Sequence, residues 1–178
     1  MKTIRVRTES LLPKLTKVRL FRYLPEDAIS RLMECSDFVE CDPQETFITE
    51  HAVEQEVYVI LSGTCSVMVE QEGRQSYVST LGPGQVVGEA AIFSTMPRTA
   101  SVVAQEKLQL MRFEREGFVK ALREDSVAGM KVLFMLVHNL LTKLREVNLE
   151  LAFERRENVD QGDVDDLIAS LMNGPASK

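Results

Sequence analysis

The sequence contains no tryptophan, two histidines and three cysteines in 178 residues. The number of cysteines is odd, and no two of them have a C-x-x-C spacing, so we expect reduced thiols rather than a disulfide framework at Cys35, Cys41 and Cys65. His51 and His138 lie far apart, and neither has a second histidine or a nucleophile motif beside it. This scarcity argues against histidine-based metal sites and hydrolase triads, so we expect no metal, no catalytic residue and no enzyme activity.

Long apolar runs and an excess of positive charge are also missing. The longest uninterrupted apolar run covers residues 132–137, which is far too short to span a bilayer. The basic start of the chain is not followed by the apolar segment of a signal peptide. The formal net charge is −6, whereas nucleic-acid-binding proteins usually carry a basic face. We therefore expect a cytoplasmic protein that binds neither membranes nor nucleic acid.

What is present is the pattern of one β-rich domain between helices. An extension over residues 1–13 precedes apolar residues at helical spacing from Lys14 to about Met33. Between Asp37 and Phe113 the apolar period changes to two, in short segments separated by turn sequences. Many short strands predict an α+β fold built on an antiparallel β-roll, a double-stranded β-helix of the jelly-roll type. We expect residues 14–125 to form this roll with its flanking helices.

Residues 126–156 are predicted to form one long helix. Apolar residues recur along it at alternating intervals of three and four, and we call this set the seam: Met130, Leu133, Val137, Leu140, Leu144, Val147 and Leu151. An unbroken heptad pattern predicts a coiled coil with a second copy of the chain, either parallel or antiparallel. The stripe could instead pack on the roll, helped by Phe134, Leu136 and Leu141. We expect its early turns to contact the roll and its later turns to contact a partner subunit.

Residues 157–178 read as an acidic linker followed by a short amphipathic helix. The apolar positions of that helix have helical spacing and are Val164, Leu167, Ile168, Leu171 and Met172. A short amphipathic helix without a core of its own is typical of a peptide that docks on another protein. The alternative is a tail that folds back onto the same chain.

Two opposite charges interrupt the apolar stretch from Val86 to Ala104. Glu89 and Arg98 lie nine residues apart there, and isolated charges are costly to desolvate without partners, so they indicate a site. The glycines of this stretch and the small residues Ala90 and Ala91 leave backbone N–H groups accessible to an anion. The Arg98 guanidinium suits a phosphate, and the Glu89 carboxylate accepts hydrogen from a sugar hydroxyl. Phosphate and sugar together indicate a nucleotide.

The same stretch resembles the phosphate-binding cassette of the cyclic-nucleotide-binding domain family, which includes catabolite activator proteins, kinase regulatory subunits and gated channels. The family pattern is Gly-Glu, two small or aliphatic residues, a short helix, then Pro-Arg, a small residue and Ala. The matching residues, on either side of the letters IFSTM, are Gly88, Glu89, Ala90, Ala91, Pro97, Arg98, Thr99 and Ala100. The resemblance spans roughly Lys14 to Leu151 and includes the strand, turn and strand of residues 57–69.

The resemblance implies a role for each matching residue. Arg98 would bind the cyclic phosphate of cAMP or cGMP, and Glu89 would accept a hydrogen bond from the ribose 2′-OH. Backbone N–H groups around Ala90, Ala91 and Thr99 would complete the anion site. Residues that could contact the base are Val87, Thr99, Asn139, Thr142 and Lys143. The residues present do not decide between cAMP and cGMP.

Some positions depart from the family pattern. Val87 stands where an aromatic residue often precedes the Gly-Glu pair, and Ala90 stands where a larger aliphatic residue is usual. Gln44 and His51 stand in turns where the family typically uses glycine. These departures bear on the shape of the pocket and on affinity, because none removes a phosphate contact.

The predicted function is that of a non-enzymatic cyclic-nucleotide sensor. Its response would reach a partner protein through the C-terminal helix and tail, since about 22 residues after Arg156 are too few for a DNA-binding domain. The alternative is a constitutive dimeric adaptor, in which Glu89 and Arg98 pair internally and the cassette stays empty.

Overall fold

The computed structural model describes residues 1–4, 8–16 and 18–172, which divide into two compact units, Met1–Leu136 and Val137–Lys178. The strands of the first unit are β1 (Lys2–Thr3), β2 (Ser36–Cys41), β3 (Thr46–Ile48), β4 (Glu56–Ser62), β5 (Cys65–Gln71), β6 (Arg74–Leu81), β7 (Val86–Val87), β8 (Ser101–Ala104) and β9 (Leu108–Glu114). The helices are α1 (Thr8–Leu15), the 3₁₀ helix η1 (Arg19–Phe21), α2 (Glu26–Glu34), α3 (Ala90–Phe93), α4 (Arg115–Glu124) and α5 (Ser126–Met172), of which α5 continues into the second unit.

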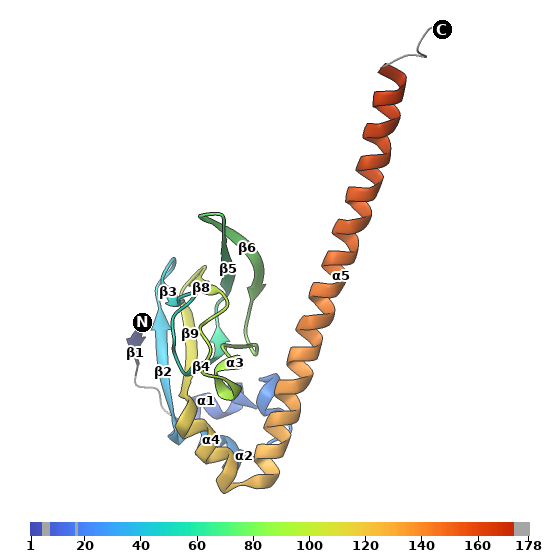
Figure 1. The fold of residues 1–178 in the computed structure, drawn as a ribbon. Coiled ribbons are helices and arrows are strands. Elements are labelled where there is room, and N and C mark those ends of the chain that lie inside the picture. Colours follow the sequence, from blue (N-terminus) through green and yellow to red (C-terminus); the bar gives the residue numbers. More distant parts are fainter. Residues whose placement is uncertain (5–7, 17, 173–178) are drawn as a thin grey trace, which may run out of the picture. The chain divides into compact units, whose positions relative to one another are not determined.

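The strands form two antiparallel sheets (Figure 1). The first sheet has the order β1-β2-β9-β4-β7, and the second has the order β3-β8-β5-β6. Strands that are far apart in sequence are neighbours, because the chain passes repeatedly from one sheet to the other. This is the antiparallel β-roll that the period-two pattern predicted.

Two apolar layers hold the first unit together. Tyr58 and Ile60 of β4 belong to a cluster that draws on strands of both sheets, while Val57 and Val59 of the same strand belong to a second cluster with the helices. Side chains alternate between the faces of a strand, so β4 is apolar at every position from Val57 to Leu61 because both of its faces are covered there. In Figure 1, α1, α2 and α4 group at one end of the strands.

Parts of residues 1–13 belong to the folded unit, although we expected an extension there. β1 pairs antiparallel with β2, with Lys2 opposite Glu40, and α1 begins at Thr8. Leu11 is buried in the helix-side apolar cluster. Burial of an apolar side chain stabilises such a segment, and this contribution was not visible in the short sequence window before Pro13.

The cysteines are free, as predicted. Cys41 and Cys65 are buried and Cys35 is half-buried. Burial raises the pKa of the Cys35 and Cys41 thiols.

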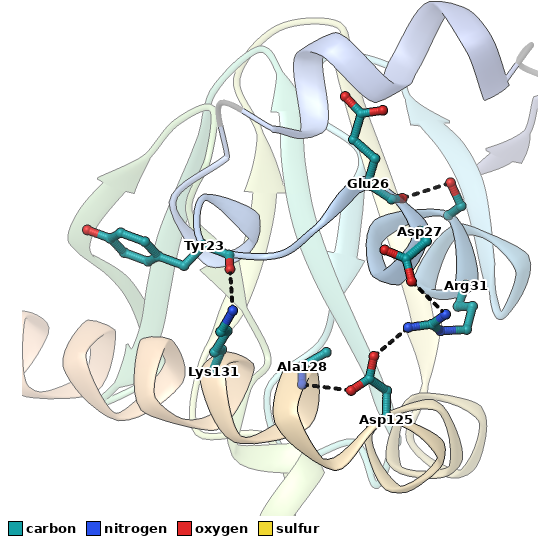
Figure 2. Close-up of polar contacts among 8 residues, drawn as sticks. Tyr23, Glu26, Asp27, Arg31, Asp125, Ala128 and Lys131 are labelled. Atoms are coloured by element: carbon teal, nitrogen blue, oxygen red, sulfur yellow. Dashed lines mark hydrogen bonds and ion pairs between the residues drawn. The ribbon is translucent and has the colours of Figure 1, made fainter.

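An acidic side chain connects the start of α5 to α2 (Figure 2). Asp125 Oδ1 accepts a hydrogen bond of 3.0 Å from the backbone N–H of Ala128, so Asp125 caps the helix. The other carboxylate oxygen of Asp125 accepts from Arg31, which also donates to Asp27 at 3.0 Å. The Ala128 hydrogen bond, followed by the charge of Arg31, lowers the pKa of Asp125 below its ordinary value. These contacts define what we call the α4–α5 junction.

The junction also depends on a close approach of the two helices. A Cβ atom at Gly129 would lie 2.2 Å from the carbonyl oxygen of Leu122 in α4, so only glycine fits there. Two residues further along, Lys131 Nζ donates a hydrogen bond of 3.1 Å to the backbone carbonyl of Tyr23. The first turns of α5 are thus tied to both α4 and the segment before α2.

The apolar residues of α5 fall into two groups. Ala128, Val132 and Leu136 are buried in the helix-side cluster, and Leu133 of the seam is packed against it. The other seam residues, which are Met130, Val137, Leu140, Leu144, Val147 and Leu151, are exposed. Phe134 and Leu141 were expected to help packing on the roll, but they are 68% and 60% exposed. A helix presents only one face to a neighbour, and that face follows Ala128, Val132 and Leu136.

Helix α5 continues to Met172 without the linker that we expected over residues 157–162. That segment contains no proline, and a single glycine in a helix costs only about 1 kcal/mol relative to alanine. Polar residues are also tolerated in a helix, so the acidic composition did not predict a break. The side chains of the tail from Phe153 onward lie outside those described.

Residues Ser126–Leu149 are long and apolar enough to cross a membrane by length and composition alone. The mean hydropathy of the apolar window is 1.4 and 22% of it is buried, and a core helix of a water-soluble protein can pass the same test. The expectation of no membrane segment was based on uninterrupted runs, whereas this window contains polar residues between its apolar ones.

Candidate functional site

The cassette residues lie on a turn and a short helix between two buried strands. β7 is followed by Gly88 with φ of +76° and then by α3, with Glu89 at the N-cap position. A Cβ atom at Gly88 would lie 2.8 Å from Nη1 of Arg98 and 3.0 Å from the carbonyl oxygen of Glu56. Glycine is therefore required here both for the left-handed backbone and for the close approach of the arginine.

Arg98 is a buried cation in contact with this turn. Its residue exposure is 7%. Nη1 donates to the carbonyl oxygen of Gly88 at 3.3 Å, and Nη2 donates to the carbonyl oxygen of Glu56 at 2.7 Å. The Arg98 side chain is thus fixed by two backbone acceptors, one on β4 and one on the cassette turn. Its position therefore depends on how closely β4 and this turn approach each other.

Two carboxylates that the sequence analysis did not identify face the same guanidinium. Glu54 Oε2 lies 3.6 Å from Arg98 Nε, and Glu56 Oε2 lies 3.9 Å from Arg98 Nη2. Among the described residues, Arg98 Nε and Glu54 Oε2 are buried without a hydrogen-bond partner. The one available sequence signal was the concentration of acidic residues at the start of a largely apolar strand.

The negative charge at this end of β4 also affects its neighbour Tyr58. Burial is the main cause that raises the pKa of the Tyr58 hydroxyl, and the carboxylates of Glu56 and Glu54 raise it further. Tyr58 is 2% exposed and stacks edge to face on Phe47, with ring centroids 5.3 Å apart. The tyrosine therefore stays neutral near neutral pH.

Backbone hydrogen bonds fix the position of Arg98 along the chain. Its N–H donates to the carbonyl of Ala52 at 2.9 Å, and its carbonyl accepts from the N–H of His51 at 2.9 Å. His51 has φ of +66°, and Gln44, which donates its N–H to the carbonyl of Ala104, has φ of +68°. Both residues adopt the left-handed conformation that the family's glycines would adopt, at a cost of roughly 1–2 kcal/mol per residue.

Glu89 and Arg98 are both buried, with exposures of 6% and 7%. Gly88, directly before Glu89, accepts a hydrogen bond from Arg98. Ala90 and Thr99 are exposed, and Ala100 is half-buried. The N–H of Ala91 was expected to be open to an anion, but it donates to the carbonyl of Gly88 at 3.0 Å. That hydrogen bond closes the turn that begins α3.

The residues proposed to contact a base lie in both units. Val87 is 6% exposed and belongs to the apolar cluster between the sheets. Asn139, Thr142 and Lys143 lie in the second unit, where the Thr142 hydroxyl donates to the carbonyl of His138 in its own helix. Their contact with a base stays a prediction.

No group of three or more His, Cys, Asp or Glu side chains that could hold a metal ion occurs in the part of the chain that the structure describes.

Comparisons with known proteins identify the domain. The family model of the cyclic nucleotide-binding domain matches residues 38–125. Potassium channel AKT1 of Arabidopsis thaliana is 25% identical over 132 residues, which cover 74% of this chain and 15% of the channel. The chain thus spans a small part of the length of this relative.

Two solved structures share the fold. A cyclic nucleotide-binding domain from Methylobacillus flagellatus KT superposes with a TM-score of 0.69 at 24% identity, over 78% of each chain. The catabolite activator protein of Thermus thermophilus has a TM-score of 0.66 at 24% identity, over 76% of this chain and 62% of that chain. The match to the family model thus identifies residues 38–125 of this chain as a cyclic nucleotide-binding domain.

Proposed function

We propose that the cassette binds a cyclic nucleotide monophosphate, cAMP or cGMP, and that the chain is a non-enzymatic sensor. One observation carries the proposal: Arg98 is a buried guanidinium beside the Gly88 turn, with Nε buried and without a hydrogen-bond partner among the described residues. A buried unsatisfied donor is costly, and a phosphate would satisfy it.

The site residues take the roles that the family resemblance implies. Arg98 binds the cyclic phosphate, and Glu89, which is also buried, accepts a hydrogen bond from the ribose 2′-OH. Backbone N–H groups near Ala90 and Thr99 support the phosphate. Val87 precedes the cassette turn and is a residue of the first unit proposed to contact the base. For Asn139, Thr142 and Lys143, contact with the base stays a prediction from the resemblance.

A homodimer and a downstream partner complete the proposal. The exposed seam residues of α5 repeat every three and four residues, and a second copy of the chain would cover them. Pairing of two seams would also account for the apolar composition of this helix without a membrane. On this basis we propose that the protein is cytoplasmic. The tail beyond residue 156 transmits the response to another protein.

Calorimetric titration of the purified chain with cAMP and with cGMP tests this function. We expect saturable binding, and we expect Arg98→Ala to weaken it at least about 100-fold, because hydrogen bonds to charged groups contribute about 1.5–3 kcal/mol each. Arg31→Ala is the matched control, since Arg31 lies at the α4–α5 junction and should leave affinity unchanged. Absence of binding to both nucleotides would contradict the proposal.

The alternative, a constitutive dimeric adaptor with an empty cassette, has its own supporting observation. Glu54 and Glu56 already place negative charge beside Arg98. In an adaptor, Arg98→Ala would change stability but would leave partner binding independent of cyclic nucleotide. In a sensor, the same substitution would abolish the response to nucleotide.

A further inference from the structure

Two carboxylates already lie beside the Arg98 guanidinium, which is the group proposed to bind the ligand phosphate. Nε and Nη2 of Arg98 lie 3.6 and 3.9 Å from the carboxylate oxygens of Glu54 and Glu56. Both distances are long for an ion pair, because the Arg98 guanidinium donates its hydrogen bonds to backbone carbonyls and not to these carboxylates. We call Glu54 and Glu56 the counter-ion pair of Arg98.

The cation and its counter-ions differ in their freedom to move. The Arg98 side chain is 6% exposed and is held by the carbonyls of Gly88 and Glu56. The side chains of Glu54 and Glu56 are 36% and 31% exposed, so both can rotate toward water, although Glu54 Oε2 is buried in this arrangement. Glu56 would give up the 3.1 Å hydrogen bond that its Oε2 accepts from the N–H of Gln55. Rotation of the two glutamates would free one side of the guanidinium without moving Arg98.

A bound phosphate would compete with these carboxylates for one positive charge. Three anions around one buried cation repel each other, and such repulsion is stronger at a partly buried site than in bulk water. Either the carboxylates leave or the phosphate binds weakly. The strength of this effect rises with the negative charge of the incoming phosphate.

We propose that Glu54 and Glu56 are specificity-determining residues, which a ligand phosphate must displace from Arg98 and which favour a singly charged phosphodiester over a doubly charged phosphomonoester. The inference rests on the proposed function of the cassette. It explains why Arg98 Nε and Glu54 Oε2 are both buried without hydrogen-bond partners among the described residues: they are ion-paired at a distance that a ligand can break.

The test compares cAMP with 5′-AMP, which carries close to two negative charges on its phosphate above pH 7. The variant is Glu54→Gln/Glu56→Gln, which keeps side-chain size and removes both charges. The matched control is Glu70→Gln/Glu72→Gln, which removes two charges from exposed residues of the β5–β6 hairpin. Each protein is titrated with both nucleotides by calorimetry at pH 7.5 after its thermal unfolding has been recorded.

We expect the Glu54→Gln/Glu56→Gln variant to bind cAMP about tenfold more tightly than the unmodified chain, since a tenfold change corresponds to one partly screened charge interaction. Its gain for 5′-AMP should be larger still, and the control should match the unmodified chain. If the double variant does not fold, the single variants Glu54→Gln and Glu56→Gln should each show a smaller gain in the same direction.

The outcomes separate the two proposals. If the unmodified chain binds cAMP and the variant binds it equally or more weakly, the counter-ion inference fails while the proposed function stands. If the gain for 5′-AMP does not exceed that for cAMP, the inference about phosphate charge fails. If only the variant binds, the proposed function of the unmodified chain fails, whereas the inference that Glu54 and Glu56 oppose a phosphate at Arg98 is supported. If neither protein binds, the proposed function fails and the inference fails with it.

Discussion

The two compact units place their apolar side chains in opposite environments. In Met1–Leu136 many apolar residues of the strands and helices fill two clusters, and Val132 and Leu136 of α5 are 0% exposed. In Val137–Lys178, seam residues of the same helix are exposed, such as Leu144 at 57%. One helix with one apolar pattern thus serves two environments. The apolar periodicity of a helix predicts that one of its faces will be covered, but it does not predict whether the same domain or a second chain covers that face.

The largest expected effect on stability comes from truncating an apolar side chain of α5 to alanine, once in the first unit and once in the second. Leu136→Ala should lower the free energy of unfolding by about 3 kcal/mol, because it leaves a cavity in a packed core. Leu144→Ala should change the unfolding of the first unit by less than about 0.5 kcal/mol, since Leu144 is exposed. Urea unfolding measures both values, and sedimentation equilibrium should show weaker self-association for Leu144→Ala only. Equal losses of stability would contradict the comparison.

A smaller effect should follow from the crossing of α4 and α5. Gly129→Ala would place a Cβ atom 2.2 Å from the Leu122 carbonyl oxygen, and such overpacking costs roughly 1–3 kcal/mol. Gly117→Ala in α4 is the matched control, because its Cβ atom would meet the nearest atom at 3.7 Å. That control should stabilise the protein by about 0.5–1 kcal/mol through helix propensity. Thermal unfolding distinguishes the opposite signs, and a stabilising Gly129→Ala would exclude the close crossing.

The smallest expected effect concerns the charge at the α4–α5 junction. The pKa of Asp125 is lowered in the folded protein, mainly by the Ala128 N–H, so its stabilising effect is present above the ordinary value of 3.8 and is lost as the pH falls through the lowered pKa. Asp125→Asn should therefore be less stable than the unmodified protein at pH 7, and the difference should shrink below pH 3.8.

The measurement is the urea midpoint at pH 7 and at progressively lower pH. Asp42→Asn, at an exposed position between β2 and β3, is the control for a general loss of negative charge. A difference between Asp125→Asn and the unmodified protein that stays constant with pH would show that the carboxylate charge does not hold the junction.

Much of the fold followed from local patterns. The change of apolar period near residue 37 predicted the roll, which the structure contains. Glu89 and Arg98, which were singled out from the sequence as a site, are both buried, and their binding role stays a prediction. The end of the long helix was predicted wrongly. The acidic composition suggested a linker, but the segment has no proline and only one glycine, so the helix continues through it. The contribution of β1 was missed because a two-residue strand has no periodicity to detect.

By itself, the sequence determined most of the strands and the turn at Gly88, because these depend on neighbours within a few positions: glycine for a left-handed turn, alternating apolar residues for strands. Only the tertiary structure decided that Glu54 and Glu56 would face Arg98, and that Val132 and Leu136, rather than most residues of the seam, would be buried in the first unit. Those contacts join residues about 40 or more positions apart along the chain, and the register of the sheets and the close approach of α4 and α5 bring them together.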